Sequence, residues 1–210
     1  MKVEIQGYQK SINQSSFSLA QAAMIWDFYV TKSVASSASQ KRTVNDYDLK
    51  LFPWKEMLEI AQIDKSNVKI LPANSINKTL AAFDLEIATG TKTQKHNREI
   101  EIDIPKIVCL TPYTIADEDK PKAKCGEAES VLTHIRNAFA HGLTYFFDNG
   151  NVLFEDRNNY GTITARIILK QQTLLDWITL IDHTQKYYVL HDFCKSCSQQ
   201  EGPKREAING

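Results

Sequence analysis

The sequence predicts a mainly α-helical protein, a helical bundle with one inserted β-hairpin or small antiparallel meander near residues 144–169. Three observations favour this class. Apolar residues recur at steps of three and four in several segments, which is the period of a helix. The period of two that is typical of strands is clearest around one turn signal, Asp148-Asn149-Gly150-Asn151. The chain has no internal repeat and no linker rich in Ser, Pro or Gly, which predicts a single domain over 1–210.

The first half of the chain is expected to supply three helices. The first spans about 16–39, with Ser15 or Ser16 as its N-cap and its apolar residues crowded into the first half. The second begins near Pro53, because proline is well tolerated in a first turn. The third begins at about Ser75. The following stretch, 99–110, alternates at first but contains a proline, and it is compatible with either a strand or a helix.

The second half of the chain has sharper patterns. A helix is expected from Glu127, with Gly142 as its C-terminal stop. Short strands then lie on both sides of the turn signal, and a further alternating strand is predicted over 162–169. The last amphipathic helix spans about 171–183. The polar tail from about residue 198 is expected to be disordered.

Composition excludes several classes of protein. Hydrophobic residues make up 42% and charged residues 24%, which is typical of a folded globular chain. The 25 basic and 25 acidic residues balance, so any polyanion has to bind a local basic patch. No stretch approaches the roughly 20 apolar residues of a membrane span, and no apolar leader follows Met1, so we expect a cytoplasmic protein without a membrane partner.

One motif stands above chance. The stretch IRNAFAHG contains Arg136, Asn137 and His141, and this Arg-Asn-x-x-x-His spacing is expected about 0.008 times by chance in such a chain. With Ile135 at the centre of the apolar arc of the helix, the three polar residues lie outside that arc. They are therefore candidates for a functional site.

The same outer face of the helix carries small residues. Positions 130, 133, 137 and 140 are Ser, Thr, Asn and Ala, which would let a second helix approach closely. This pattern predicts a two-fold interface, and hence a homodimer in which the polar trio borders a groove between the two copies.

The chemistry of the trio suits RNA cleavage without a metal ion or other cofactor. A histidine such as His141 transfers protons near neutral pH, and it is suited to deprotonate a ribose 2′-hydroxyl or to protonate the leaving 5′-oxygen. A guanidinium such as that of Arg136 stabilises charge on the phosphorus centre, and the Asn137 amide orients either partner. Since one histidine does not readily serve as base and acid together, a dimer with two copies of the trio is expected.

The motif and its setting resemble the HEPN superfamily (higher eukaryote and prokaryote nucleotide-binding), most closely its stand-alone bacterial and plasmid-borne members. The likeness covers residues 127–182 well, where the motif helix is followed by a glycine, a β-hairpin and another helix. It implies a HEPN-like helical bundle and a dimeric, metal-independent endoribonuclease that leaves 2′,3′-cyclic phosphate and 5′-hydroxyl ends. It also implies a toxin or phage-defence setting with an antitoxin protein as partner. Arg136, Asn137 and His141 match the family motif.

Two other interpretations of the motif stay open. A HEPN dimer can be catalytically silent and bind a nucleotide or a partner protein. Alternatively, Arg and His near a helix end serve only to bond the last carbonyl groups and to complement the helix dipole. His134 is expected at the edge of the apolar arc, as a boundary side chain rather than a catalytic one. The neighbouring acids at 155 and 156 are interpreted as ordinary turn residues.

Weaker patterns concern RNA and metal binding. Two groups of basic residues are candidates for contacts with an RNA backbone. The first is Lys92, Lys95 and Arg98, for which a solvated loop is the alternative interpretation. The second is Arg157 and Arg166. Near the C-terminus, His191, Cys194 and Cys197 have the spacing of zinc ligands. No second CxxC pair completes a four-ligand set, so no metal site is predicted.

Overall fold

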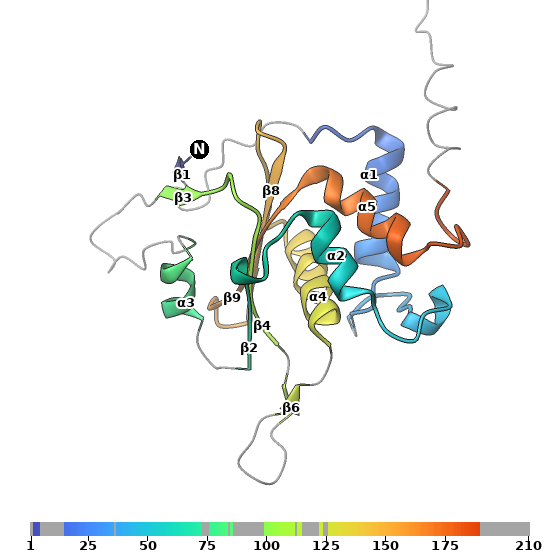
Figure 1. The fold of residues 1–210 in the computed structure, drawn as a ribbon, viewed down its shortest axis with the longest axis horizontal. Helices are drawn as coiled ribbons and strands as arrows, with labels where there is room; N and C mark the ends of the chain where they lie inside the picture. Colours follow the sequence, from blue (N-terminus) through green and yellow to red (C-terminus); the bar gives the residue numbers. More distant parts are fainter. Residues whose placement is uncertain are drawn as a thin grey trace, which may run out of the picture.

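Figure 1 shows the fold of the chain in a computed structural model, in which a short helix lies on one side of a β-sheet and a layer of helices lies on the other. The structure describes residues 2–4, 15–35, 37–72, 76–83, 85, 99–111, 113–114, 122–123 and 126–189. The five-stranded main sheet has the order β2-β4-β9-β8-β7. Its strands are β2 (Val68–Leu71), β4 (Lys106–Leu110), β7 (Thr144–Phe146), β8 (Asn151–Arg157) and β9 (Ile163–Lys170).

The sheet is mixed. Strand β2 pairs with β4 in the parallel direction, and the other three pairs are antiparallel. Because β4 and β8 are both antiparallel to β9, which lies between them, their C-terminal ends meet at the same edge of the sheet. This edge positions the candidate site described below. Two further pairs of short strands are β1 (Lys2–Glu4) with β3 (Glu99–Glu101), and β5 (Tyr113–Thr114) with β6 (Lys122–Ala123).

In the described part of the chain, five segments are α-helical and three others are short π- or 3₁₀-helical segments. The α-helices are α1 (Leu19–Trp26), α2 (Trp54–Ala61), α3 (Asn77–Ala82), α4 (Glu127–Ala140) and α5 (Gln171–Ile181). A π-helical segment, η1 (Asp27–Thr31), continues α1, and two 3₁₀ turns are η2 (Val44–Tyr47) and η3 (Lys65–Asn67).

The predicted fold class is wrong. The molecule is an α/β protein built on a five-stranded mixed sheet, not a mainly α-helical bundle of HEPN type with an inserted hairpin near residues 144–169. The predicted meander is present as β7, β8 and β9, but β9 also pairs with β4, which pairs with β2. The undecided stretch 99–110 forms strands β3 and β4. Because β9 also pairs with β4, which is distant in the sequence, the predicted hairpin forms part of a larger central sheet.

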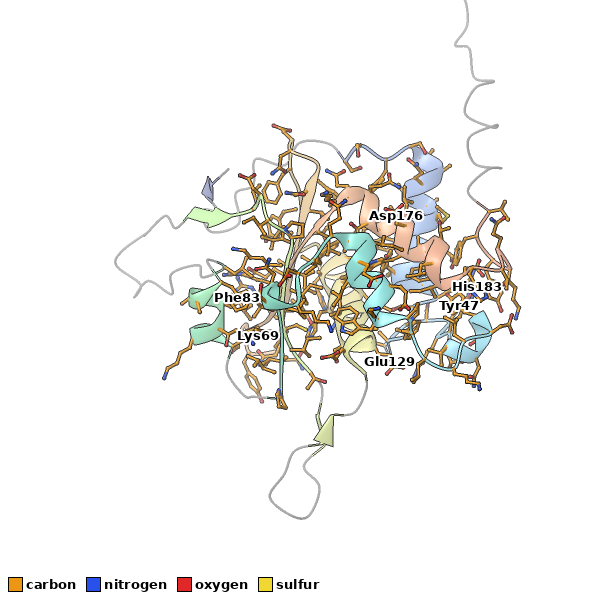
Figure 2. The ribbon with its side chains drawn as sticks, in the orientation of Figure 1. Tyr47, Lys69, Phe83, Glu129, Asp176 and His183 are labelled. Carbon is orange, nitrogen blue, oxygen red and sulfur yellow. The ribbon has the colours of Figure 1, made fainter. Side chains whose placement is uncertain are left out.

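Both faces of the main sheet are covered. Alternate residues of β9 show this: Ile167 belongs to a large apolar cluster with residues of α1, α2, α4 and α5, whereas Ile168 belongs to a second cluster with Ile76 and Leu80 at α3. Figure 2 shows the side chains between these layers, with Phe83 on the α3 side and Asp176 among the helices of the other side. A central strand that is buried on both faces has to pair any charged side chain that it carries. The same constraint applies to the charged residues at the candidate site.

The first helix is shorter than predicted. Ser18, not Ser15 or Ser16, is its N-cap: the Ser18 hydroxyl accepts a hydrogen bond from the backbone N–H of Gln21, and the Gln21 side chain accepts one from the N–H of Ser18. The helical backbone ends at Thr31 rather than near residue 39. The serine-rich sequence after Lys32 explains the early end, because serine side chains compete for backbone hydrogen bonds and favour turns.

The helices and strands predicted between residues 127 and 183 are confirmed. Helix α4 ends at Ala140, and Gly142 follows in the left-handed region with φ of 66°. Gly150 of the hairpin turn also has a positive φ, of 79°. Helix α5 occupies 11 residues of the predicted range 171–183. None of the helices in the described residues is long and apolar enough to cross a bilayer.

We expect the substitution Gly142→Ala to destabilise the protein by about 1–2 kcal/mol. A methyl group at Gly142 would touch no other atom, so the cost comes from the left-handed backbone alone. Denaturant unfolding measures the difference. Asparagine tolerates this conformation, so Gly142→Asn is the control and is expected to cost less than Gly142→Ala. Equal stability of Gly142→Ala and the unsubstituted protein would contradict the argument.

Candidate functional site

A pocket of about 500 Å³ lies between one side of α4 and the edge of the sheet where β4 and β8 end. Polar side chains dominate its lining. Helix α4 contributes Thr133, His134, Asn137 and His141. The end of β4, the end of β8, the following turn and the start of β9 complete the wall, with Leu110, Thr111, Asp156, Arg157, Asn158, Asn159, Tyr160 and Thr164.

His134 is held at the base of this pocket between two acceptors. Its Nδ1 lies 2.7 Å from Oδ2 of Asp156, and its Nε2 lies 2.6 Å from the carbonyl oxygen of Leu110. A carboxylate and a carbonyl both accept hydrogen bonds, so the ring bonds to both when each nitrogen carries a hydrogen, as in the imidazolium form. His134 is therefore a fixed, buried wall of the pocket rather than the boundary side chain expected from the helical period.

Asp156 connects this histidine to the motif. Its Oδ2 also accepts a hydrogen bond of 3.0 Å from the Asn137 amide, and its Oδ1 accepts one of 2.8 Å from the backbone N–H of Arg157. The carboxylate is 4% exposed, so all of its acceptor capacity is directed at these neighbours. Asp156 thereby positions Asn137, whose amide reaches the pocket from the helix.

A second buried carboxylate lies one residue earlier. Glu155 is 2% exposed and is shared by two guanidinium groups: its Oε1 lies 2.6 Å from Nη2 of Arg157 and its Oε2 lies 2.8 Å from Nη2 of Arg166. Burial lowers the pKa of Arg166, and the nearby charge of Glu155 opposes that effect. Arg166 also donates to the carbonyl oxygen of Leu85. With the carboxylate of Asp156, these two carboxylates and two guanidinium groups balance in charge, and the partly exposed guanidinium of Arg157 lies in the pocket wall.

Arg136 points away from this pocket. Its Nη2 donates a hydrogen bond of 2.8 Å to the carbonyl oxygen of Ser37, and its Nη1 donates one of 3.2 Å to the side-chain oxygen of Asn137. Its Nε is buried and has no hydrogen-bond partner within the described ranges. Arg136 thus contacts Asn137 and is not part of the pocket lining.

The predicted trio is therefore brought together in part. Asn137 and His141 line one pocket, as neighbours four residues apart on the helix, and the His141 side chain is exposed. Arg136 contacts Asn137 but bonds to Ser37 outside the pocket. The arrangement offers an accessible imidazole, an oriented amide and a polar wall that includes the guanidinium of Arg157.

One prediction for this helix needs correction. Ser130 is fully buried, with its hydroxyl 3.0 Å from that of Thr111, so it cannot contact a second helix. Asn137 is half-buried and bonds to Asp156. The helix is buried over a wider arc than its apolar residues indicate, because the ends of β4 and β8 pack against its polar side. The homodimer stays a prediction.

The candidate RNA-binding residues have different outcomes. Arg166 is fully buried in its ion pair and has no surface to offer to RNA, which corrects the expectation for that residue. Arg157 lines the pocket and is 30% exposed in its side chain, although Glu155 binds its guanidinium. Lys92, Lys95 and Arg98 lie outside the described residues.

The zinc-like cluster and the tail also fall outside the description. His191, Cys194 and Cys197, and the segment from residue 198, are not among the described residues. Over the described part of the chain, no group of three or more His, Cys, Asp or Glu side chains is arranged to hold a metal ion.

Sequence reasoning missed Asp156 and Glu155, which it interpreted as turn residues. Both lie in β8, whose residues from Asn151 to Asp156 are all buried. The available signal was the hydrophobic run VLF directly before the two acids, since a strand covered on both faces has to pair any carboxylate that it carries. His134 and Asn137, three residues apart on the preceding helix, are the matching partners.

Comparison of the chain with protein-family models, with curated proteins and with solved structures gave no match. The fold and the pocket define this protein as an α/β protein with a polar pocket at one edge of its sheet.

Proposed function

We propose that this pocket binds RNA and cleaves it without a metal ion, which makes the protein an endoribonuclease. One observation carries the proposal: the exposed imidazole of His141 and the Asn137 amide share a pocket of about 500 Å³ with the partly exposed guanidinium of Arg157. An imidazole suits proton transfer near neutral pH, and local positive charge suits a phosphodiester.

In the proposed reaction His141 takes the proton of a ribose 2′-hydroxyl. The 2′-oxygen then attacks the adjacent phosphorus, the bond from phosphorus to the 5′-oxygen breaks, and a 2′,3′-cyclic phosphate forms. The departing 5′-oxygen takes a proton from an acid, for which we propose the imidazolium of His141 in a second copy of the chain. Asn137 donates its amide to a phosphate oxygen, and Arg136 holds Asn137 through their shared hydrogen bond.

The substrate and product chemistry test this proposal. RNA incubated with the protein in excess EDTA is expected to give fragments with 2′,3′-cyclic phosphate and 5′-hydroxyl ends. A matched oligonucleotide with a single 2′-deoxyribose at the cut position is expected to stay intact at that position, because the nucleophile is missing. Cleavage of the 2′-deoxy position at the same rate, or a requirement for a divalent cation, would overturn the proposal.

A non-catalytic binding role is the second candidate, and the placement of Arg136 favours it. Its guanidinium bonds to the Ser37 carbonyl and to Asn137, so within one chain it does not face a phosphate in the pocket. On this alternative the pocket holds a nucleotide or a partner protein and turns nothing over. RNA that stays intact with the protein at every pH from 5 to 9, while still binding to it, would favour this second candidate over the first.

A further inference from the structure

The turn between β8 and β9 carries an aromatic side chain with no role in the core. Tyr160 is 93% exposed, the most exposed of the large hydrophobic residues in the described part of the chain, and it lines the mouth of the pocket. Within the described residues, its ring packs against no other aromatic ring and its hydroxyl has no hydrogen-bond partner. The side chain thus contributes nothing visible to the folded core.

The backbone beneath Tyr160 is firmly held. The side-chain oxygen of Asn158 accepts hydrogen bonds of 3.0 Å from the N–H groups of Tyr160 and Thr162. Its backbone N–H and C=O also bond to Thr162 and Gly161, at 2.9 Å each. Gly161 has a φ of 77°, which closes the turn, and Arg157 donates to its carbonyl. Exposure of the ring is therefore a property of an ordered turn and not of a loose loop.

Two further polar side chains line the same pocket. The Asn159 amide is exposed, and the Thr164 hydroxyl is half-buried at the start of β9. Neither side chain has a hydrogen-bond partner in the part of the chain that the structure describes, so both are available to a ligand. The positively charged guanidinium of Arg157, whose side chain is 30% exposed, also lines this pocket.

We propose that Tyr160, with Asn159 and Thr164, forms a nucleobase-binding subsite, and that the pocket takes unpaired nucleotides of single-stranded RNA. An exposed aromatic face stacks on a base, amide and hydroxyl groups bond to the edge of the base, and the neighbouring positive charge attracts its phosphate. A base within a duplex presents neither its face nor its pairing edge. This subsite rests on the proposed function, because it assigns that pocket its substrate class.

A binding assay tests the subsite separately from cleavage. The probe is a fluorescein-labelled ten-nucleotide 2′-O-methyl RNA without self-complementarity, which lacks the attacking hydroxyl, and its dissociation constant is read by fluorescence anisotropy. Tyr160→Ala is expected to raise the dissociation constant about 5- to 150-fold, which corresponds to the loss of one stacked base. Tyr160→Phe, the matched control, is expected to stay within about 2-fold because it keeps the aromatic face. The unsubstituted protein is expected to bind the duplex form of the probe with a dissociation constant at least as high as that of Tyr160→Ala for the single strand.

Each outcome decides between the two proposals. Unchanged binding by Tyr160→Ala, an equal loss in Tyr160→Phe, or duplex binding as tight as that of the single strand would overturn the subsite, even if cleavage through His141 is observed. The expected binding pattern together with a complete absence of cleavage would keep the subsite and overturn the nuclease. A change in oligomeric state in Tyr160→Ala, read by light scattering, would show that a protein covers this ring and would also overturn the subsite.

Discussion

The substitution His141→Ala is expected to lower the rate of RNA cleavage at least about 100-fold, the usual effect of removing a group that transfers a proton in the transition state. The structure gives two reasons why this substitution should lower the cleavage rate without lowering the stability of the protein. The side chain is exposed, and the helix-capping contact at this position, to the carbonyl oxygen of Asn137, comes from the backbone N–H that alanine retains. We therefore expect the free energy of unfolding to change by no more than about 0.5 kcal/mol.

His183→Ala is the matched control for this experiment. His183 is also exposed and follows α5, and it does not line the pocket (Figure 2). Its loss is expected to leave cleavage unchanged. Initial rates on a labelled RNA, measured for both variants and the unsubstituted protein, make the comparison. Cleavage by His141→Ala at a rate within about 3-fold of the unsubstituted protein would remove His141 from the reaction, since a proton-transfer group is worth far more.

The substitution Glu155→Gln is expected to destabilise the protein by about 3 kcal/mol, because it leaves two guanidinium groups facing each other without a carboxylate. Arg166 is fully buried and Arg157 is 30% exposed in its side chain, so water cannot replace the lost charge at the inner arginine. Urea unfolding, followed by circular dichroism and by the fluorescence of the buried Trp177, measures the loss.

An exposed ion pair supplies the control. Glu59→Gln removes the partner of Lys55 on the surface of α2, where the charged groups are 3.5 Å apart and the side chains are 64% and 74% exposed. Its expected cost is below about 0.5 kcal/mol, because water screens the pair. If Glu155→Gln costs no more than Glu59→Gln, then the shared carboxylate does not hold β8 and β9 together as we argue.

The sequence predicts those elements whose pattern is local and long. Helix α4 shows its apolar spacing over 14 residues and ends at a glycine, so both its extent and its stop are confirmed. The turn before β8 needs a positive φ at one position, and Gly150 supplies it. The strand β9 alternates over eight residues, which is enough to show its period.

The fold class could not be predicted because it depends on pairing between distant segments. Strand β2 has four residues and β4 has five, lengths at which strand and helix patterns are hard to tell apart. Their parallel pairing joins Val68 to Ile107, across a long stretch of chain that contains α3, and no local pattern links the two strands. Only the pairing shows that the hairpin is part of a larger sheet, and hence that helices cover both of its faces.

The site could be predicted in its helical part alone. Asn137 and His141 are recognised from a spacing within one helix, and the structure brings them to one pocket. The partner of Asn137, Asp156, lies 19 residues further along the chain in a strand, so no local pattern joins them. A helical arc calculated from apolar residues alone does not include polar side chains that are buried by hydrogen bonds. For this reason Ser130 was predicted outside the buried side of the helix and His134 at its edge, although both are buried.

The two edge strands of the main sheet limit how a second copy of the chain can associate with it. β2 has four residues and β7 has three, so each offers few free backbone donors and acceptors along its outer side. Short edge strands of this kind disfavour strand pairing between the sheets of separate chains. A homodimer of this protein is accordingly expected to form through helices and loops, and its sheet is expected to end within each subunit.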